Sequence, residues 1–324
     1  MGILARIDDQ QRAHRWLAFP FAVYKKFSDD QSGNLAVLIT YYAFFSIFPL
    51  LIALASVMGF VLHGHPSEYR HVENDALANF PLINKAPLPK QGSALVVVFG
   101  VVLAVYSGLG VAKTAQTAWD TVYLVARTDQ PGFVPKTLRA LRLIVVGGLG
   151  LILTTLIAGI PASGKSVGLN LGWVATILGV ALAVVLNALL FTTLFRWLTV
   201  RPVSFRDALP GGVIAAVSFA VLQTTATAFQ THKLASANAT YGSFGSVIVL
   251  MSWFYLQSQA MLFAAQVNVV RQYRLWPRAL TDAPATEADF RAFEGYAERE
   301  RYVDEEDVDT SYDRTAATEP PASD

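Results

Sequence analysis

Six long apolar runs constrain the fold of this chain more than any other feature of its sequence. They cover residues 35–62, 94–111, 141–160, 173–195, 208–229 and 244–270. A hydrocarbon core about 30 Å thick is crossed by about 20 apolar helical residues, and every run is close to or above that length. Only 15% of the residues are charged, whereas soluble domains typically have about 25%. The sequence therefore predicts an all-α, polytopic membrane bundle of six transmembrane helices.

Charge divides the chain into a basic part and an acidic part. Residues 1–281 hold 21 Lys and Arg against 10 Asp and Glu, or +11, whereas residues 282–324 hold 4 against 14, or −10. We expect 1–34 to be an N-terminal segment with an interfacial amphipathic helix, because it mixes aromatic with basic residues. Residues 35–270 form the six-span domain, and 271–324 an acidic, largely disordered tail. A second hypothesis is that this tail docks onto the protein's own basic loops.

Lys and Arg are also unequally shared between alternate loops. Twenty lie on the side of the two termini and five on the opposite side. Because cytoplasmic loops are enriched in Lys and Arg, we predict that both termini are cytoplasmic. The segments 63–93, 161–172 and 230–243 then face outward.

Two motifs resemble ligand sites, and both have a simpler interpretation. Gly159–Ser166 matches the phosphate-binding pattern GxxxxGK[ST], but that loop needs a strand before it in a water-accessible α/β domain. Here it joins two spans, so a small-residue turn is the preferred interpretation. His63, His65, Glu68 and His71 form a sparse cluster after the first span. No second cluster completes a metal site, so we predict a polar loop and no bound metal.

The spans contain neutral polar residues in place of charges. Two interpretations remain open: hydrogen bonds between helices, or a polar cavity for an uncharged or headgroup-bearing substrate. Gly242 and Gly245 permit a bent entry into the last span, because glycine has no Cβ. The residues predicted to border such a path are Tyr41, Tyr42, Ser46, Asn187, Tyr241, Gly242, Gly245, Gln259, Gln266 and Asn268.

The residues for hydrolytic chemistry are missing from the spans. No Ser–His–Asp set can be placed on one membrane side, and no pair of carboxylates faces inward. Cysteine is absent from the chain, which excludes thiolate ligands and cysteine catalysis. We therefore predict no catalytic residue, no cofactor and no nucleic-acid partner.

Three segments resemble the YihY/BrkB family of bacterial inner-membrane proteins. They are the stretch from Tyr41 to Leu51, the stretch from Arg201 to Gly211, and the YGSFG motif that begins at Tyr241. The resemblance runs from about Phe21 to Arg274 and implies six spans, an inner-membrane location and a part in envelope properties. The family usually carries a Glu shortly before an Asn near the end of the last span; Gln266 and Asn268 stand at those positions here. The family was once labelled a ribonuclease, which the residues of the spans do not support.

The favoured function is the binding or translocation of a lipid-like or amphipathic substrate through a neutral polar path, with membrane lipids as partners. The alternative is a structural or partner-binding envelope protein that transports nothing. A pump with a buried carboxylate is disfavoured, since the spans hold almost no ionisable residues. Neither the substrate nor the oligomeric state follows from the sequence.

Overall fold

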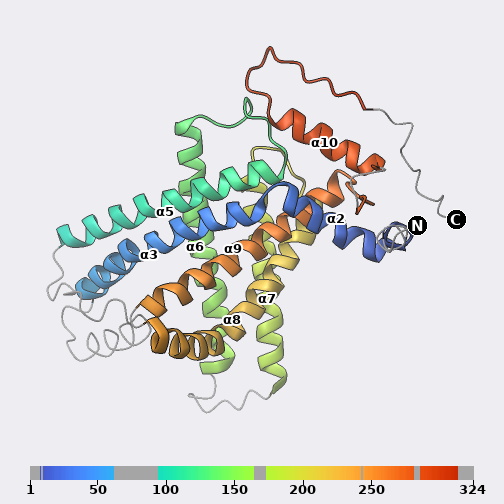
Figure 1. The fold of residues 1–324 in the computed structure, drawn as a ribbon. Coiled ribbons are helices and arrows are strands. Elements are labelled where there is room, and N and C mark those ends of the chain that lie inside the picture. Colours follow the sequence, from blue (N-terminus) through green and yellow to red (C-terminus); the bar gives the residue numbers. More distant parts are fainter. Residues whose placement is uncertain are drawn as a thin grey trace. The chain divides into compact units, whose positions relative to one another are not determined.

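The computed structural model describes residues 8, 10–61, 94–163, 173–241, 244–280 and 285–312, and within these ranges the regular structure is helical. Figure 1 shows the order of the helices along the chain. They are α2 (Arg15–Asp29), α3 (Ser32–Val61), α5 (Ala94–Val122), α6 (Phe133–Ser163), α7 (Trp173–Leu198), α8 (Phe205–Tyr241), α9 (Phe244–Gln272) and α10 (Glu287–Arg299).

Six of these helices are long and apolar enough to cross a membrane. The candidate spans are Ser32–Val57, Val97–Val122, Phe133–Thr154, Ile177–Leu198, Phe205–Thr225 and Val247–Gln272. Each has at least the roughly 20 residues that a bilayer requires. The prediction of an all-α bundle with six spans is therefore confirmed.

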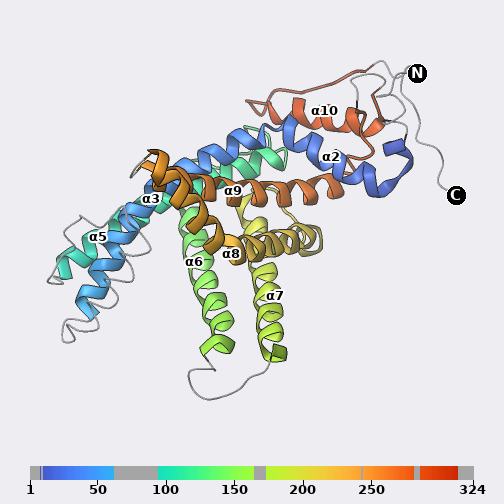
Figure 2. The ribbon, with the colours of Figure 1, turned by 60° about the horizontal axis from the view of Figure 1, so that its bottom comes forward.

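The chain forms two compact units, which we describe separately. Unit 1 comprises Met1–Leu35, Ala115–Ala220 and Gln259–Asp324, and unit 2 comprises Ala36–Thr114 and Val221–Ser258. In unit 1, α6 and α7 run side by side as a hairpin (Figures 1 and 2). A Cβ on Gly150 would lie 2.6 Å from Leu190 Cδ1. Glycine at this position therefore lets α6 approach α7 closely.

In unit 1, α2 lies against the end of α9 and the segment that comes after it. The ring of Phe27 lies 6.2 Å from that of Phe263, and the ring of Phe19 lies 6.0 Å from that of Trp276. The order of these contacts is reversed along the two segments, so α2 runs antiparallel to the end of α9. The helix predicted in the N-terminal segment is present, with Ala18, Ala22 and Val23 buried; its position at a membrane interface stays a prediction.

In unit 2, α3 and the first two-thirds of α5 pack through glycines of α5. A Cβ on Gly100 would lie 3.1 Å from Ala53 Cα, and one on Gly110 would lie 2.9 Å from the ring of Tyr42. Helices in lipid commonly associate in this way, because small residues let their backbones come close.

The acidic tail contains more structure than the sequence predicts. Residues 285–312 are described, and they include α10, which begins with a capping box between Thr286 and Asp289. The prediction of a largely disordered tail from residue 271 needs this correction. The charge composition of this segment does not predict the helix, because the stability of the helix comes from contacts with distant parts of the chain. Residues 313–324 lie outside the described part.

The tail also docks on the loop between α5 and α6, as the second hypothesis predicted. The backbone N–H of Arg127 donates to Arg299 O at 3.2 Å, and that of Thr128 donates to Arg301 O at 3.3 Å. The Thr128 hydroxyl donates to Asp304 Oδ1 at 2.7 Å. The segment after α10 therefore runs along this loop.

Candidate functional site

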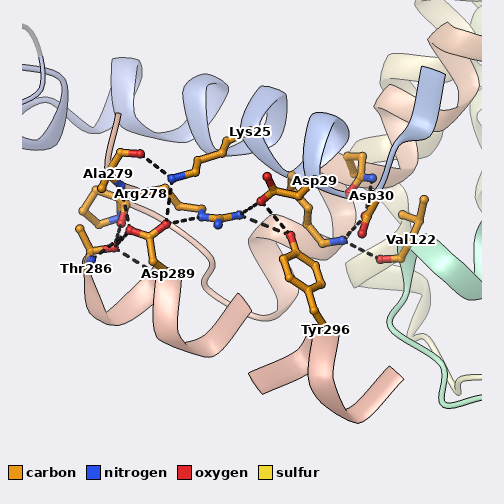
Figure 3. Close-up of polar contacts among 12 residues, drawn as sticks. Lys25, Asp29, Asp30, Val122, Arg278, Ala279, Thr286, Asp289 and Tyr296 are labelled. Carbon is orange, nitrogen blue, oxygen red and sulfur yellow. Dashed lines mark hydrogen bonds and ion pairs between the residues drawn. The ribbon is translucent and has the colours of Figure 1, made fainter. Parts of the chain in front are cut away.

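A set of charged and polar side chains, buried at its centre and partly exposed at its edge, joins α2, α9, α10 and the segment between α9 and α10 within unit 1. We call it the terminal network. Figure 3 shows most of its members between the helices. It consists of Lys25, Lys26, Asp29, Asp30, Gln266, Arg278, Asp289, Tyr296 and Arg299.

Arg278 is the centre of one half of the terminal network. Its side chain is fully buried, and its Nε donates to Asp289 Oδ1 at 2.7 Å while its Nη1 donates to Asp29 Oδ2 at 2.8 Å. Asp289 Oδ2 also accepts the backbone N–H groups of Ala279 at 2.9 Å and Thr286 at 3.0 Å. Burial disfavours the charged carboxylate, but these N–H donors and Arg278 outweigh it and lower the pKa of Asp289 to about 2. Asp289 is therefore ionised at neutral pH.

Asp30 is the centre of the other half. Its carboxylate pairs with Lys26, accepts Arg299 Nη1 at 3.0 Å, and accepts Gln266 Nε2 at 2.8 Å. Lys26 also donates to Val122 O at 3.0 Å, at the end of α5. Burial lowers the pKa of Lys26, and the neighbouring Asp30 carboxylate offsets part of that effect. The network thus ties the beginning of α3 to the ends of α5 and α9.

Tyr296 bridges the two halves from α10. Its hydroxyl donates to Asp29 Oδ2 at 3.1 Å and accepts from Arg278 Nη1 at 3.4 Å. Burial raises the pKa of this phenol, and the carboxylates of Asp30 and Asp29 raise it further. Tyr296 therefore stays protonated and acts as a donor at physiological pH.

Asn268 forms a second polar contact, with the first turns of α8. Its Oδ1 accepts the backbone N–H of Gly211 at 2.7 Å, and its Nδ2 donates to Ala208 O at 3.2 Å. A Cβ on Gly211 would lie 2.4 Å from Ala264 O, so only glycine allows α8 to approach α9 this closely. Pro210 stands beside it within the helix.

The structure places the predicted path residues in both units. Asn187, Gln259, Gln266 and Asn268 belong to unit 1, whereas Tyr41, Tyr42, Ser46, Tyr241 and Gly245 belong to unit 2. The amides of Gln266 and Asn268 are fully buried and hydrogen-bonded to other helices, as the first interpretation of the polar residues expects. Their part in a substrate path stays a prediction.

The remaining predicted path residues differ in their burial and in their hydrogen bonds. Asn187 is buried, and its Oδ1 has no hydrogen-bond partner within the described part of the chain. Ser46 donates to Ala43 O at 2.8 Å within its own helix. Gly245 is buried near the start of α9. Tyr241 ends α8, but its side chain and all of Gly242 lie outside the described residues.

Three tyrosines form a half-exposed patch on α3 and α5 of unit 2. We call Tyr41, Tyr42 and Tyr106 the tyrosine patch; the exposed fractions of their side chains are 51%, 43% and 75%. The rings of Tyr41 and Tyr42 meet edge to face, 5.6 Å apart. Tyr106 lies one helical turn before Gly110, which contacts Tyr42. Tyr106 was not among the predicted path residues.

Sequence reasoning also missed the terminal network. By charge alone, Lys25 and Lys26 belong to the predicted amphipathic N-terminal segment, and Arg278 belongs to the basic part of the chain. The one local signal was Thr286 followed three residues later by Asp289, a spacing that marks the start of a helix. The role of Asp289 in the network depends on Arg278, which contacts Asp289 only in the folded chain.

A metal site is not evident in the part of the chain that the structure describes, where no group of three or more His, Cys, Asp or Glu side chains could hold an ion. The histidine cluster after the first span and the last three residues of the Gly159–Ser166 motif lie outside that part.

Comparisons with known proteins cover most of the chain. The family profile described as virulence factor BrkB matches residues 23–289. The inner membrane protein YhjD of Escherichia coli is 25% identical over 278 residues, covering 78% of this chain and 81% of YhjD. The ribonuclease-like protein YfkH of Bacillus subtilis is 22% identical over 275 residues, covering 80% and 96%. A UPF0761 membrane protein of Alcanivorax borkumensis is 26% identical over 276 residues, covering 81% and 62%. No solved structure matches the chain.

Proposed function

We propose that this chain binds or translocates a lipid-like or amphipathic substrate. The premise is that the chain belongs to the virulence factor BrkB family and is an integral membrane protein. The name of the Escherichia coli relative places that relative in the inner membrane. We propose the same location for this chain, with both termini cytoplasmic.

The tyrosine patch carries this proposal. Tyr42 lies ten residues into the span that begins at Ser32, and Tyr106 nine residues into the span that begins at Val97. At 1.5 Å per residue both are about 15 Å from the nearer end of their spans. That depth is near the middle of a hydrocarbon core about 30 Å thick.

Tyrosines that are about half-exposed or more are unusual at that depth. Tyrosine is enriched at the two membrane interfaces, where its hydroxyl reaches water. An unpaired hydroxyl in an apolar medium costs roughly 1–3 kcal/mol by protein mutational data. A substrate that brings a polar group to this depth would offset that cost, and its apolar part would pack on the rings. An amphipathic molecule has both parts.

The test is translocation of a labelled lipid by the purified protein. Proteoliposomes carry nitrobenzoxadiazole-labelled phosphatidylethanolamine, and external dithionite bleaches the label that reaches the outer leaflet. We expect the protein to accelerate bleaching of the inner-leaflet label. The triple variant Tyr41→Phe, Tyr42→Phe, Tyr106→Phe keeps the rings and loses the hydroxyls, so bleaching should slow at least about fivefold, equivalent to roughly 1 kcal/mol.

Tyr24→Phe is the matched control, because Tyr24 is an exposed tyrosine on α2, outside the spans. A photoactivatable phosphatidylethanolamine separates binding from translocation, since it labels the protein in either case. If the wild-type protein neither moves nor captures the lipid, or if the triple variant behaves as the wild type, the proposal is wrong.

The second candidate is a structural or partner-binding envelope protein without transport. The observation that favours it is the packing of Gln266 and Asn268, whose amides hold helices together. It predicts that the triple tyrosine variant keeps full cellular function at normal protein levels. We propose no enzymatic activity, and the ribonuclease-like label in the name of the Bacillus subtilis relative is not carried over, because the spans hold no catalytic set.

A further inference from the structure

The first three turns of α6 carry three basic residues on one side of the helix. They are Lys136, Arg139 and Arg142, each three residues after the last, and we call them the α6 basic stripe. They lie at or just before the start of the apolar run 141–160. Charged groups at such a position lie at the level of lipid headgroups.

Arg142 is exposed and stacks on an aromatic ring. Its guanidinium lies over the ring of Trp197 on α7, with 3.4 Å between the guanidinium carbon and the ring centroid. A cation–π contact uses the face of the guanidinium. The N–H groups at its edge therefore stay available for an anion, and this planar fork matches phosphate oxygens.

Arg139 provides a second, independent observation. Its Nη1 is buried and has no hydrogen-bond partner in the described part of the chain. Arg139 as a whole is half-buried, and its positive charge attracts an anion at the stripe. Lys136, one turn earlier, is held by a hydrogen bond from its Nζ to Thr117 Oγ1 at 2.7 Å.

One carboxylate balances part of this charge. Asp120 at the end of α5 interacts electrostatically with Lys136 and Arg139. Its Oδ1 accepts the backbone N–H of Val200 at 3.0 Å, so it is partly used in holding the α7–α8 loop. The stripe and Asp120 together keep an excess of two positive charges.

Apolar side chains lie beside the stripe on the same turns of α6. Phe133, Val134, Leu138 and Val145 are all exposed. Trp197 is the second-last residue of the α7 span, where aromatic side chains favour the interface. A ligand at the stripe would therefore meet cations and exposed apolar side chains on the same turns of α6.

We propose that the α6 basic stripe, with Trp197, binds the phosphate headgroup of an anionic phospholipid of the surrounding membrane. The headgroup accepts from Arg142 and is attracted by the charges of Arg139 and Lys136, and the acyl chains lie along the exposed apolar side of α6. Free phosphate would leave that apolar surface uncovered. This site belongs to unit 1 and does not depend on the tyrosine patch of unit 2, so it stands or falls separately from the proposed function.

Native mass spectrometry of the full-length protein in detergent tests this site. The protein is mixed with dioleoyl phosphatidylglycerol or dioleoyl phosphatidylcholine, and the fractions with retained lipid are compared. We expect the wild type to retain phosphatidylglycerol preferentially. Each of Arg139→Gln and Arg142→Gln should weaken that preference about fivefold, the effect of one basic residue near a membrane surface. Trp197→Leu should weaken it without removing a charge.

Arg206→Gln is the matched control, because it removes one exposed positive charge from the first turn of α8. It should leave the preference intact, and a melting curve checks that all variants are folded. The proposal is overturned if the wild type shows no preference or if Arg206→Gln lowers it as much as Arg142→Gln. It is also overturned if millimolar inorganic phosphate displaces the retained lipid, which would identify a free-phosphate site.

Discussion

At the scale of single residues, Asn268 shows how one amide can hold two spans together. Its oxygen accepts from Gly211 and its nitrogen donates to Ala208. Both partners lie on α8, next to Pro210, which has no N–H and interrupts the hydrogen bonding of its own helix. Asn268 therefore joins two backbone groups of the proline-containing turn of α8 to α9.

Asn268→Leu should lower the thermal stability of the purified protein. The substitution leaves the Gly211 N–H and the Ala208 carbonyl without their side-chain partner, at roughly 1–3 kcal/mol for a buried group. Asn34→Leu is the control, since Asn34 is exposed and its side chain bonds only to Gln31, three residues away. Equal melting temperatures for the two variants would show that the Asn268 contacts contribute little.

Asp289 predicts a response to acid. Its pKa is about 2 in the folded chain, against an ordinary 3.8. A carboxylate whose pKa is lower in the folded chain than in the unfolded chain stabilises the folded form at pH values above the ordinary pKa. That contribution is lost as the pH falls from about 4 to about 2. A spin label on a single cysteine at Ala297, in this cysteine-free chain, should become mobile across that window.

In Asp289→Asn the same label should be mobile already at pH 6, with a smaller change between pH 4 and pH 2. The variant cannot ionise, so any change that remains comes from other carboxylates. A wild-type label that stays immobile at pH 2 would contradict the assigned role of Asp289.

At the scale of elements, α10 is held by contacts of two kinds. Arg278 and Asp289 are buried, whereas Arg127 and Glu300 form a pair whose side chains are about half exposed. Removing one partner of a buried pair typically costs about 3–5 kcal/mol, because it leaves an uncompensated charge. An exposed pair contributes at most about 1 kcal/mol.

Arg278→Met should therefore release α10, and Arg127→Gln should leave it docked. An endoproteinase that cuts after glutamate reports this, because Glu294 and Glu298 lie within α10. We expect cleavage at these sites to be at least about tenfold faster in Arg278→Met, since proteolysis follows the population of the open form. Similar cleavage rates in the two variants would show that the buried pairs do not determine docking.

At the scale of the whole molecule, the charge pattern predicts how the protein is oriented in the membrane. With 20 basic residues on the side of the termini and 5 on the other, reporter fusions active only outside the cytoplasm should work near Asn79, Ser166 and Ser236. Fusions near Thr128 and Thr199 should be inactive there. The reverse pattern would overturn the cytoplasmic location of the termini.

The number of spans could be predicted from the sequence alone. Whether a segment crosses a bilayer depends on its own length and apolarity, because lipid can satisfy no backbone hydrogen bond and each span must do so within itself. The same local property explains why the helix of the tail was missed. Glu287–Arg299 is polar and short, and its stability depends on Arg278, Asp29 and Asp30.

Only the tertiary structure decided what the polar residues do. Asp30 and Gln266 are 236 residues apart in sequence, Asp29 and Arg278 are 249 apart, and Gly211 and Asn268 are 57 apart. Composition can show that such residues are present, but hydrogen bonds and ion pairs act over a few ångströms. Local sequence therefore determined where this chain crosses the membrane, and long-range contacts determined which polar groups hold it together and which stay exposed to a ligand.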